Sequence, residues 1–301
     1  MKTKLVCEKV MMLNSKDDCI STEIAVNGDL LLLEAPIQPE HVDGFVQVAI
    51  KQNWTVHIIN NQQYKKIEFH DVPINIHHVQ TFSDGTIMLV GSRCEYNEGK
   101  PDKNARFYDC NGRFLYALTF GDGIQSVQVD EQDRIWISYF DEGVFGNYGW
   151  DEPIGRHGLI LFDRQGNILW HAGEYDISDC YALNVASSDK VCFYYYHDFK
   201  FVILDELFQP TFFEVKKDSF WEFAISDDTM AIFDGYDSYI CHRKGHTFNK
   251  GRRIQYVDEH REKISGRLAM RGKTIYIYST EGIYKTKLSG IKRRMVPRVG
   301  W

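Results

Sequence analysis

Acidic and histidine side chains near the predicted strand ends are the first candidates for chemistry. Carboxylate oxygens and imidazole nitrogens bind divalent cations, and the sequence offers such groups at Glu23, His77, His78, Asp141 and Glu142. Successive side chains of a strand point to opposite faces, so only one of His77 and His78 is expected to face a given site. A divalent cation held by Glu23, His77 and Asp141 is therefore the alternative hypothesis, and the preferred expectation is no metal and no cofactor.

Motifs for nucleophilic catalysis and for phosphate binding are weak. The chain has no GxSxG segment and no cysteine in an evident histidine-paired motif. The GDG at 121–123 precedes a strand and not a helix, unlike phosphate-binding loops. DEGVFGN at 141–147 lacks the acid that a calcium loop needs at its twelfth position. These observations favour a binding role over an enzymatic one.

Aromatic side chains beside acids and arginines indicate where a partner could bind. The segment ISYFDEGVFGNYGWDEPIG at 137–155 begins as a strand and opens into a loop of acids, glycines and aromatics. Aromatic anchors with a charged rim suit a protein, a peptide or a small polar ligand. The predicted binding residues are His77, Arg93, Tyr96, Asp141, Glu142, Phe145, Asn147, Tyr148, Trp150, Arg156 and Trp221. The alternatives are core packing for each aromatic and a structural cap for the loop.

These residues lie in a repeating pattern of a strand, a tight polar turn and a strongly apolar strand. Turns such as NG, DG and DD are typical of β-hairpins. The hairpins start at intervals in or near the range of propeller repeats. They read EIAVNGDLLLLEA from 23, VQTFSDGTIMLVGS from 79, VQVDEQDRIWISYF from 127, LNVASSDKVCFYYY from 183, EFAISDDTMAIFDG from 222 and RLAMRGKTIYIYST from 267.

Two further strand candidates follow each hairpin, which predicts an all-β, single-domain, six-bladed β-propeller of four-stranded antiparallel blades. The expected blades span 20–69, 74–120, 124–172, 177–215, 219–257 and 264–289. The last repeat lacks a fourth strand, so the N-terminal segment 3–12 is expected to supply it and close the ring, because open sheet edges are a liability. An extra edge strand is the alternative for this segment.

Connections between the second and third strands of each blade share one face of a propeller with the channel mouth. They are long in blades 1 to 3 (35–44, 93–104 and 141–158) and short in the other three. Long loops are often functional, so this face is the predicted binding face. The inner strands should bring Ser21, His77, Gln125, Tyr181, Phe220 and Ser265 to the mouth, followed by Thr22, His78, Ser126, Ala182, Trp221 and Gly266. One position deeper the inner strands should place Glu23, Val79, Val127, Leu183, Glu222 and Arg267. Arg267 is expected to form an ion pair with Glu222, and a substrate-binding role is the alternative for Arg267.

The third repeat, VQVDEQDRIWISYFDEGV, resembles propeller repeats of the NHL and two-component-regulator sensor type, and YFDEGVFG is similar to a string in uncharacterised bacterial propeller proteins. This resemblance implies a fold and not a function. Glu23 on the first inner strand also resembles an ion ligand of gluconolactonase-class propellers. That comparison implies the alternative function, a metal-dependent, lactonase-like hydrolase at the channel mouth. The asparagine and aspartate of that class lack counterparts here.

Composition sets the remaining expectations. The net charge of −7 gives no electrostatic reason for a nucleic-acid or membrane partner. Seven cysteines without CxxC pairs argue against a disulfide framework or a zinc site. No apolar run approaches the ~20 residues of a spanning helix, and no signal peptide is evident. We therefore expect a cytoplasmic monomer, with a solvated basic segment at 290–301.

Overall fold

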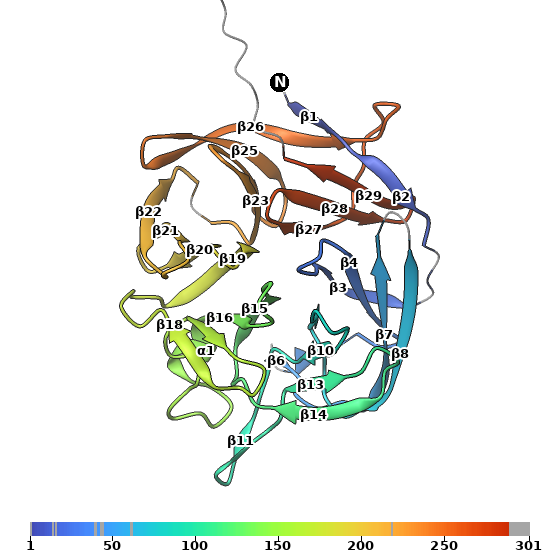
Figure 1. The fold of residues 1–301 in the computed structure, drawn as a ribbon, viewed down its shortest axis with the longest axis vertical. Helices are drawn as coiled ribbons and strands as arrows, with labels where there is room; N and C mark the ends of the chain where they lie inside the picture. Colours follow the sequence, from blue (N-terminus) through green and yellow to red (C-terminus); the bar gives the residue numbers. More distant parts are fainter. Residues whose placement is uncertain are drawn as a thin grey trace, which may run out of the picture.

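Short strands joined by tight turns make up nearly all of the regular structure. The computed structural model describes residues 2–13, 15, 17–38, 41–42, 45–60, 63–217 and 219–288, so the basic segment 290–301 and the last residue of the sixth predicted blade lie outside it. The protein is all-β, with small antiparallel sheets arranged around a centre (Figure 1). The described part contains one α-helix, α1 (Asp141–Phe145), and no helix there could cross a membrane.

Six consecutive antiparallel meanders form these sheets, and we number them 1 to 6 along the chain. Meander 1 contains β3 (Asp18–Ile24), β4 (Leu30–Ala35), β7 (Gln52–Ile59) and β8 (Tyr64–Val72). Meander 2 contains β9 (His78–Thr81), β10 (Ile87–Val90), β13 (Ala105–Tyr108) and β14 (Phe114–Leu118). Meander 3 contains β15 (Ile124–Val129), β16 (Ile135–Tyr139), β17 (Leu159–Phe162) and β18 (Ile168–His171).

The second half of the chain repeats the pattern. Meander 4 contains β19 (Asp179–Ser187), β20 (Lys190–Tyr196), β21 (Lys200–Leu204) and β22 (Pro210–Val215). Meander 5 contains β23 (Glu222–Ser226), β24 (Thr229–Phe233), β25 (Ser238–Lys244) and β26 (Thr247–Val257). Meander 6 contains β27 (Arg267–Arg271), β28 (Thr274–Ser279) and β29 (Gly282–Lys287), with β2 (Glu8–Met11) at its outer edge.

The sheets differ in number from the six separate blades that the sequence predicts. Meanders 1, 2, 3 and 6 are separate four-stranded sheets, whereas meanders 4 and 5 belong to one nine-stranded sheet. The outer strand of meander 5, β26, joins the two meanders, because it pairs with β25 on one edge and with β22 on the other. Its first residues pair in parallel with the end of β22, Glu214 opposite Thr247 and Val215 opposite Phe248.

The N-terminal segment is also divided, where the sequence predicts one strand over 3–12. β1 (Thr3–Val6) pairs in parallel with β26, and β2 pairs antiparallel with β29. The buried Cys7 lies between them, and its N–H donates to the carbonyl of Val257 at 2.8 Å. Residues 3–11 thus contact both of the last two meanders.

Hairpin turns of the predicted kind orient the inner strands. Gly28, Gly85, Asp133 and Asp227 occupy these turns with positive φ angles of 86°, 83°, 58° and 48°, the conformation that glycine and aspartate tolerate best. Each inner strand contacts the next in the order β3, β9, β15, β19, β23, β27, and β27 contacts β3. The starts of these six strands therefore meet in the middle of the molecule.

The hydrophobic core lies between neighbouring meanders. Trp54 and Phe69 of meander 1 pack with Leu89 of meander 2 in one cluster, and Phe107 packs with Phe162 of meander 3 in the next. Further clusters join meanders 3 and 4, 4 and 5, 5 and 6, and 6 and 1. Apolar packing therefore fixes the position of each sheet against two neighbours.

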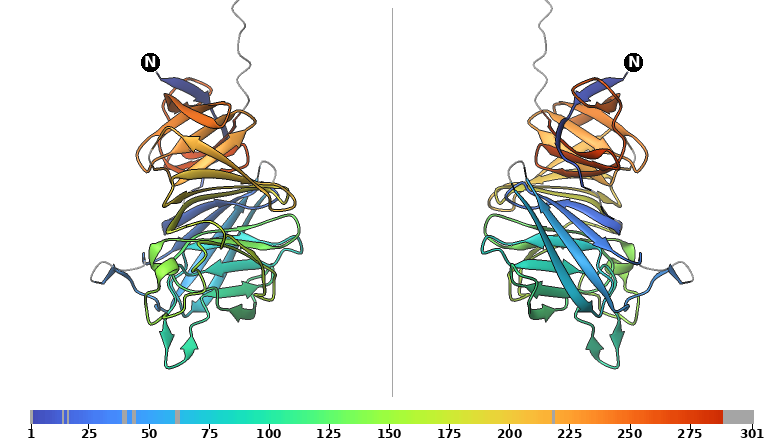
Figure 2. Two further views of the ribbon diagram at one scale, coloured as in Figure 1. Left: turned by 90° about the vertical axis from the view of Figure 1, so that its left-hand side faces the viewer. Right: turned by 90° about the vertical axis from the view of Figure 1, so that its right-hand side faces the viewer.

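The connections of meanders 1 to 3 contain short elements of their own. The first holds the hairpin β5 (His41–Val42) and β6 (Phe45–Val46), the second holds β11 (Tyr96–Asn97) and β12 (Lys100–Pro101), and the third holds α1. Figure 2 shows both hairpins projecting from the body of the molecule, with α1 on the same side as β5–β6. The long connection of meander 3 is therefore partly helical.

Candidate functional site

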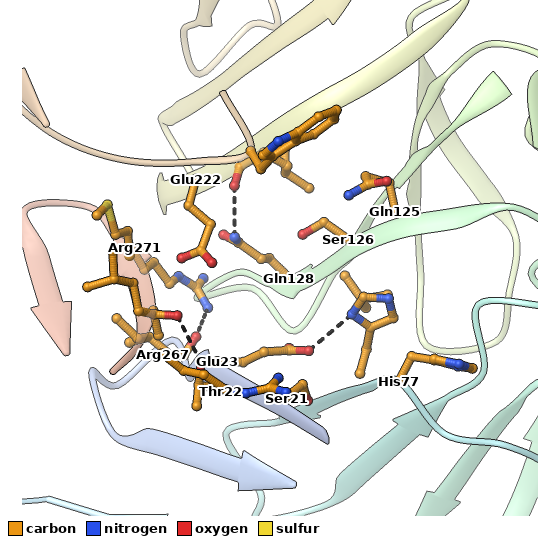
Figure 3. Close-up of a pocket in the computed structure, with 18 of the residues that line it drawn as sticks. Ser21, Thr22, Glu23, His77, Gln125, Ser126, Gln128, Glu222, Arg267 and Arg271 are labelled. Atoms are coloured by element: carbon orange, nitrogen blue, oxygen red, sulfur yellow. Dashed lines mark hydrogen bonds and ion pairs between the residues drawn. The ribbon is translucent and has the colours of Figure 1, made fainter. Parts of the chain in front are cut away.

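A cavity of about 490 Å³ lies at the centre of the ring (Figure 3). The starts of the inner strands of all six meanders line it, as the aligned repeats predict. The predicted lining residues that the structure places there are Ser21, Thr22, Glu23, His77, His78, Gln125, Ser126, Val127, Tyr181, Leu183, Trp221, Glu222, Gly266 and Arg267. Phe220, Ala182 and Val79 instead belong to the buried core, and Ser265 lines a different pocket. Most of the mouth could thus be predicted from the repeat register.

Aromatic rings form one wall of the cavity. The indole of Trp221 is 42% exposed and contacts the ring of Tyr181 edge-on, at 4.7 Å between centroids. Tyr181 also stacks on Tyr196, and the ring of Phe199 is 6.4 Å from it. The wall presents an accessible aromatic face whose orientation is set by these neighbouring rings.

Amide side chains beneath the cavity connect neighbouring meanders. Gln80, Gln128 and Asn184 lie at the same position of their repeats, and each bonds to the backbone of the next meander. Their partners are, in order, Val129 N at 3.4 Å, Leu183 O at 3.0 Å and Phe223 O at 2.6 Å. This recurring amide is visible in the aligned repeats, but it belongs to no single motif, so the sequence-based prediction did not include it.

Arg271 closes the floor of the cavity. Its guanidinium is buried and donates to the carbonyls of Val185 at 2.9 Å, Ile24 at 3.0 Å and Val129 at 2.5 Å, and to Gln80 Oε1 at 3.4 Å. Burial lowers the pKa of Arg271 to about 10, which leaves the group charged at neutral pH. One side chain of meander 6 thus bonds to meanders 1, 2, 3 and 4.

Two carboxyl groups face the cavity in different environments. Burial, with the nearby charge of Glu23, raises the pKa of Glu222 to about 8, against the opposing effect of a backbone hydrogen bond from Met270. Glu222 is therefore largely protonated at neutral pH, and its O–H is a donor. Glu23 accepts hydrogen bonds from Gln80 Nε2 at 2.7 Å and from the N–H of Val79 at 3.3 Å.

The prediction of an ion pair between Arg267 and Glu222 is wrong. Arg267 is exposed and donates from Nη1 to the carbonyl of Ile20 at 2.8 Å. No ion pair joins the two side chains in the described part of the chain. Glu222 instead accepts a hydrogen bond from the backbone of Met270.

Both histidines line the cavity, although the strand pattern predicts that only one would. His77 precedes β9, so the alternation of a strand does not apply to it. Its Nδ1 accepts the backbone N–H of Ser92 at 3.0 Å, while His78 lies 3.1 Å from Glu23 Oε1 and 3.1 Å from Ser92 Oγ. Ser92 thus contacts both histidines, and no sequence motif predicted these contacts.

The described residues contain no group of three His, Cys, Asp or Glu side chains arranged to hold a metal ion. Glu23, His77 and Asp141 consequently do not form the ligand set of the alternative hypothesis. The hydrogen bonds that Glu23 accepts from His78, Gln80 and Val79 occupy both of its oxygens.

Arg93, expected on the surface, is buried between the long connections of meanders 2 and 3. It forms a double hydrogen bond with Asp122, Nε to Oδ1 at 3.0 Å and Nη2 to Oδ2 at 2.9 Å, and an ion pair with Glu142. Its guanidinium also lies over the ring of Tyr148, 4.4 Å from the centroid. The charge is buried because two carboxylates and an aromatic face surround it.

Trp150 is likewise buried, where the sequence predicts an exposed anchor. Its indole N–H donates to the carbonyl of Cys94 at 2.7 Å, and its ring packs on Tyr96 at 4.9 Å. The N–H of Tyr96 bonds to the carbonyl of Tyr148 at 2.9 Å. These contacts join the two connections, which is the behaviour expected of a structural cap.

The other predicted binding residues remain at the surface. Phe145 is 70% exposed at the end of α1, and Asp141 and Arg156 are exposed as well. Asn147 accepts the N–H of Tyr148 at 2.8 Å. The structure thus separates the predicted set into cavity residues, loop-packing residues and exposed residues.

Comparisons with known proteins give a partial family match and distant structural likenesses. Residues 155–286 match the sequence profile of the YxzG family. No protein of curated function shows significant sequence similarity. Virginiamycin B lyase from Staphylococcus aureus is 9% identical, with 94% of this chain and 99% of that chain covered and a TM-score of 0.46.

Two further solved structures give similar values. A streptogramin B lyase is 11% identical, with 94% of this chain and 87% of that chain covered and a TM-score of 0.49. The extracellular domain of a putative hybrid two-component system from B. thetaiotaomicron is 12% identical, with 93% and 40% covered and a TM-score of 0.47. At these values the likenesses carry no argument about activity.

Proposed function

We propose that this protein binds a small polar ligand in the central cavity, on the face that carries the long connections of meanders 1 to 3. The observation that carries the proposal is the aromatic wall of Trp221 and Tyr181 above a polar lining. Concave sites with an apolar surface and a few convergent polar groups are typical ligand sites. The burial of Arg93 and Trp150 favours a small ligand over a protein or peptide held by the loops.

The hydrogen-bonding groups of the lining indicate the chemistry of the ligand. Gln125 and Ser126 make no side-chain hydrogen bond within the described residues, so both are available to a ligand. The protonated Glu222 offers a donor, and Arg267 has N–H groups beyond the one bonded to Ile20. A compact molecule with several hydroxyl or carbonyl oxygens, and one face flat enough to stack on Trp221, suits this set.

We also propose that the fold is a six-bladed propeller. Meanders 4 and 5 count as two blades despite their shared sheet, because a separate apolar cluster packs between them. The pairing of β2 with β29 supports β2 as the outer strand of the sixth blade. We further propose a cytoplasmic monomer that needs no cofactor and binds neither nucleic acid nor membrane.

Ligand-induced thermal stabilisation tests the binding proposal. A panel of methyl glycosides and polyols should raise the melting temperature of the wild-type protein for at least one member. Trp221→Ala should abolish that shift, and Tyr236→Ala, which removes an aromatic ring that is 93% exposed outside the cavity, should preserve it. A shift of equal size in Trp221→Ala would exclude the cavity as the site.

A further inference from the structure

Two side chains that line the cavity, Glu23 and His78, and the neighbouring Ser92 have the arrangement of an orienting acid, a base and a nucleophile. Ser92 Oγ lies 3.1 Å from His78 Nε2, and His78 Nδ1 lies 3.1 Å from Glu23 Oε1. A catalytic triad is recognised by this geometry and not by order or spacing in the sequence. We propose that Ser92 is a nucleophile activated by His78 and oriented through Glu23, and that the cavity cleaves small carboxylic esters.

The surrounding hydrogen bonds select the tautomer that such a mechanism needs. A carboxylate only accepts hydrogen bonds, so the imidazole proton lies on Nδ1, toward Glu23, which leaves Nε2 to accept the proton of Ser92. Glu23 is held in turn by Gln80 Nε2 at 2.7 Å. The Oε1 of Gln80 accepts from Arg271 at 3.4 Å, which fixes the direction of its amide. The acid is therefore positioned by a chain of hydrogen bonds that begins at the floor of the cavity.

Backbone contacts hold Ser92 beside the cavity. It follows β10, its N–H donates to His77 Nδ1 at 3.0 Å, and its carbonyl accepts the N–H of Ile124 at 3.0 Å. The preceding Gly91 has no room for a side chain, because a Cβ there would lie 2.6 Å from the carbonyl oxygen of Asn75. Ser92 is partly exposed, and its partner His78 lines the cavity.

A donor for the developing oxyanion must come from another residue, because the N–H of Ser92 is already bonded to His77. Gln125 is the candidate. The register of β15 and β16 shifts between Ile124 and Ser126, so Gln125 sits in a β-bulge, and its side chain lines the cavity. Bulges redirect side chains next to active sites. The bond from Ile124 to Ser92 places this bulge beside the nucleophile.

The reaction balances with these groups and water. Ser92 Oγ attacks the ester carbonyl carbon while His78 Nε2 takes its proton. The C–O bond to the alcohol then breaks, and the alcohol leaves with the proton from His78. Water adds to the acyl-serine with His78 again as base, releasing the carboxylic acid and regenerating Ser92. The step needs no oxidant or reductant.

Covalent labelling with a small fluorophosphonate tests the inference on the whole protein. The probe should modify Ser92, identified by peptide mass spectrometry, and p-nitrophenyl acetate should be hydrolysed with a burst of p-nitrophenol. Ser92→Ala should abolish both. Glu23→Gln should slow labelling by about 10²- to 10⁴-fold by favouring the wrong tautomer, as loss of the acid does in known triads.

Ser187→Ala is the matched control, because Ser187 is also partly buried and bonds to the carboxylate of Asp189 without a histidine. It should label and hydrolyse like the wild type. Absence of label on Ser92, or equal labelling of Ser92 and Ser187, would overturn the proposal. The inference shares the cavity of the proposed function, but a Trp221-dependent thermal shift in a wild-type protein that shows no label on Ser92 would overturn the inference alone, so the two can fail separately.

Discussion

Replacing Arg271 by alanine should destabilise the whole ring, because this side chain bonds to four other meanders. The substitution removes the donor for the carbonyls of Ile24, Val129 and Val185 and for the side chain of Gln80. No other described side chain donates to those three carbonyls. Each belongs to a different sheet, so the loss acts on several interfaces together.

The expected loss in the free energy of unfolding follows from the number of backbone carbonyls that Arg271→Ala leaves without a hydrogen-bond donor. A buried carbonyl that loses its donor costs about 1–3 kcal/mol, which gives about 3–9 kcal/mol for three. Water entering from the cavity replaces part of the loss, so we expect about 3–6 kcal/mol for Arg271→Ala. Arg271→Lys keeps the charge but not the forked geometry, so we expect it to cost less stability than Arg271→Ala and more than Arg267→Ala.

Urea-induced unfolding, followed by far-ultraviolet circular dichroism and by tryptophan fluorescence, measures this cost. Arg267→Ala is the control, because Arg267 is exposed and its one bond, to the carbonyl of Ile20, can be replaced by solvent. That control should change the free energy of unfolding by less than about 1 kcal/mol. If Arg271→Ala and Arg267→Ala were equally stable, the guanidinium would not be the link that holds the meanders together.

Trp150→Ala should reduce the free energy of unfolding by about 3–5 kcal/mol, because it leaves a buried cavity and removes the hydrogen-bond donor to the carbonyl of Cys94. The control Phe145→Ala, at an exposed position, should change the free energy of unfolding by less than about 0.5 kcal/mol. Equal effects of the two variants in urea unfolding would contradict the role of the loop as a structural cap. The pKa of Glu222 is raised from its ordinary value of 4.5 to about 8, so the folded state binds this proton more tightly and stability should fall as pH rises through that window. Glu222→Gln should reduce the decrease in melting temperature between about pH 5 and about pH 8. If the decrease were the same as in the wild type, the pH dependence would come from other groups. Cys110 is the exposed thiol among the seven cysteines, so one thiol of the wild-type protein should react rapidly with Ellman's reagent. No thiol of Cys110→Ser should react rapidly. Several rapidly reacting thiols in that variant would show that the core opens readily.

The repeat pattern predicted the residues at the mouth of the cavity but not the burial of the residues in the long connections. The alignment of hairpins brought Gln125, Ser126 and Trp221 to one mouth from strands far apart in sequence, since equivalent positions of a radial repeat meet near its axis. Arg93 and Trp150 were expected to be exposed and are buried, because the packing of neighbouring connections on each other leaves no mark on the repeat pattern.

Local chemistry explains why strands and turns could be predicted. Turn residues, the alternation of side chains and runs such as LLLLEA act over a few positions, so the sequence by itself determined the hairpins, their order and the residues facing the axis. Contacts across long separations have no such local signal. Arg271 reaches a carbonyl 247 positions away, and Glu23 meets His78 across 55. Only the closed packing of the sheets decided that those groups share one buried space, where desolvation makes each unsatisfied polar atom costly.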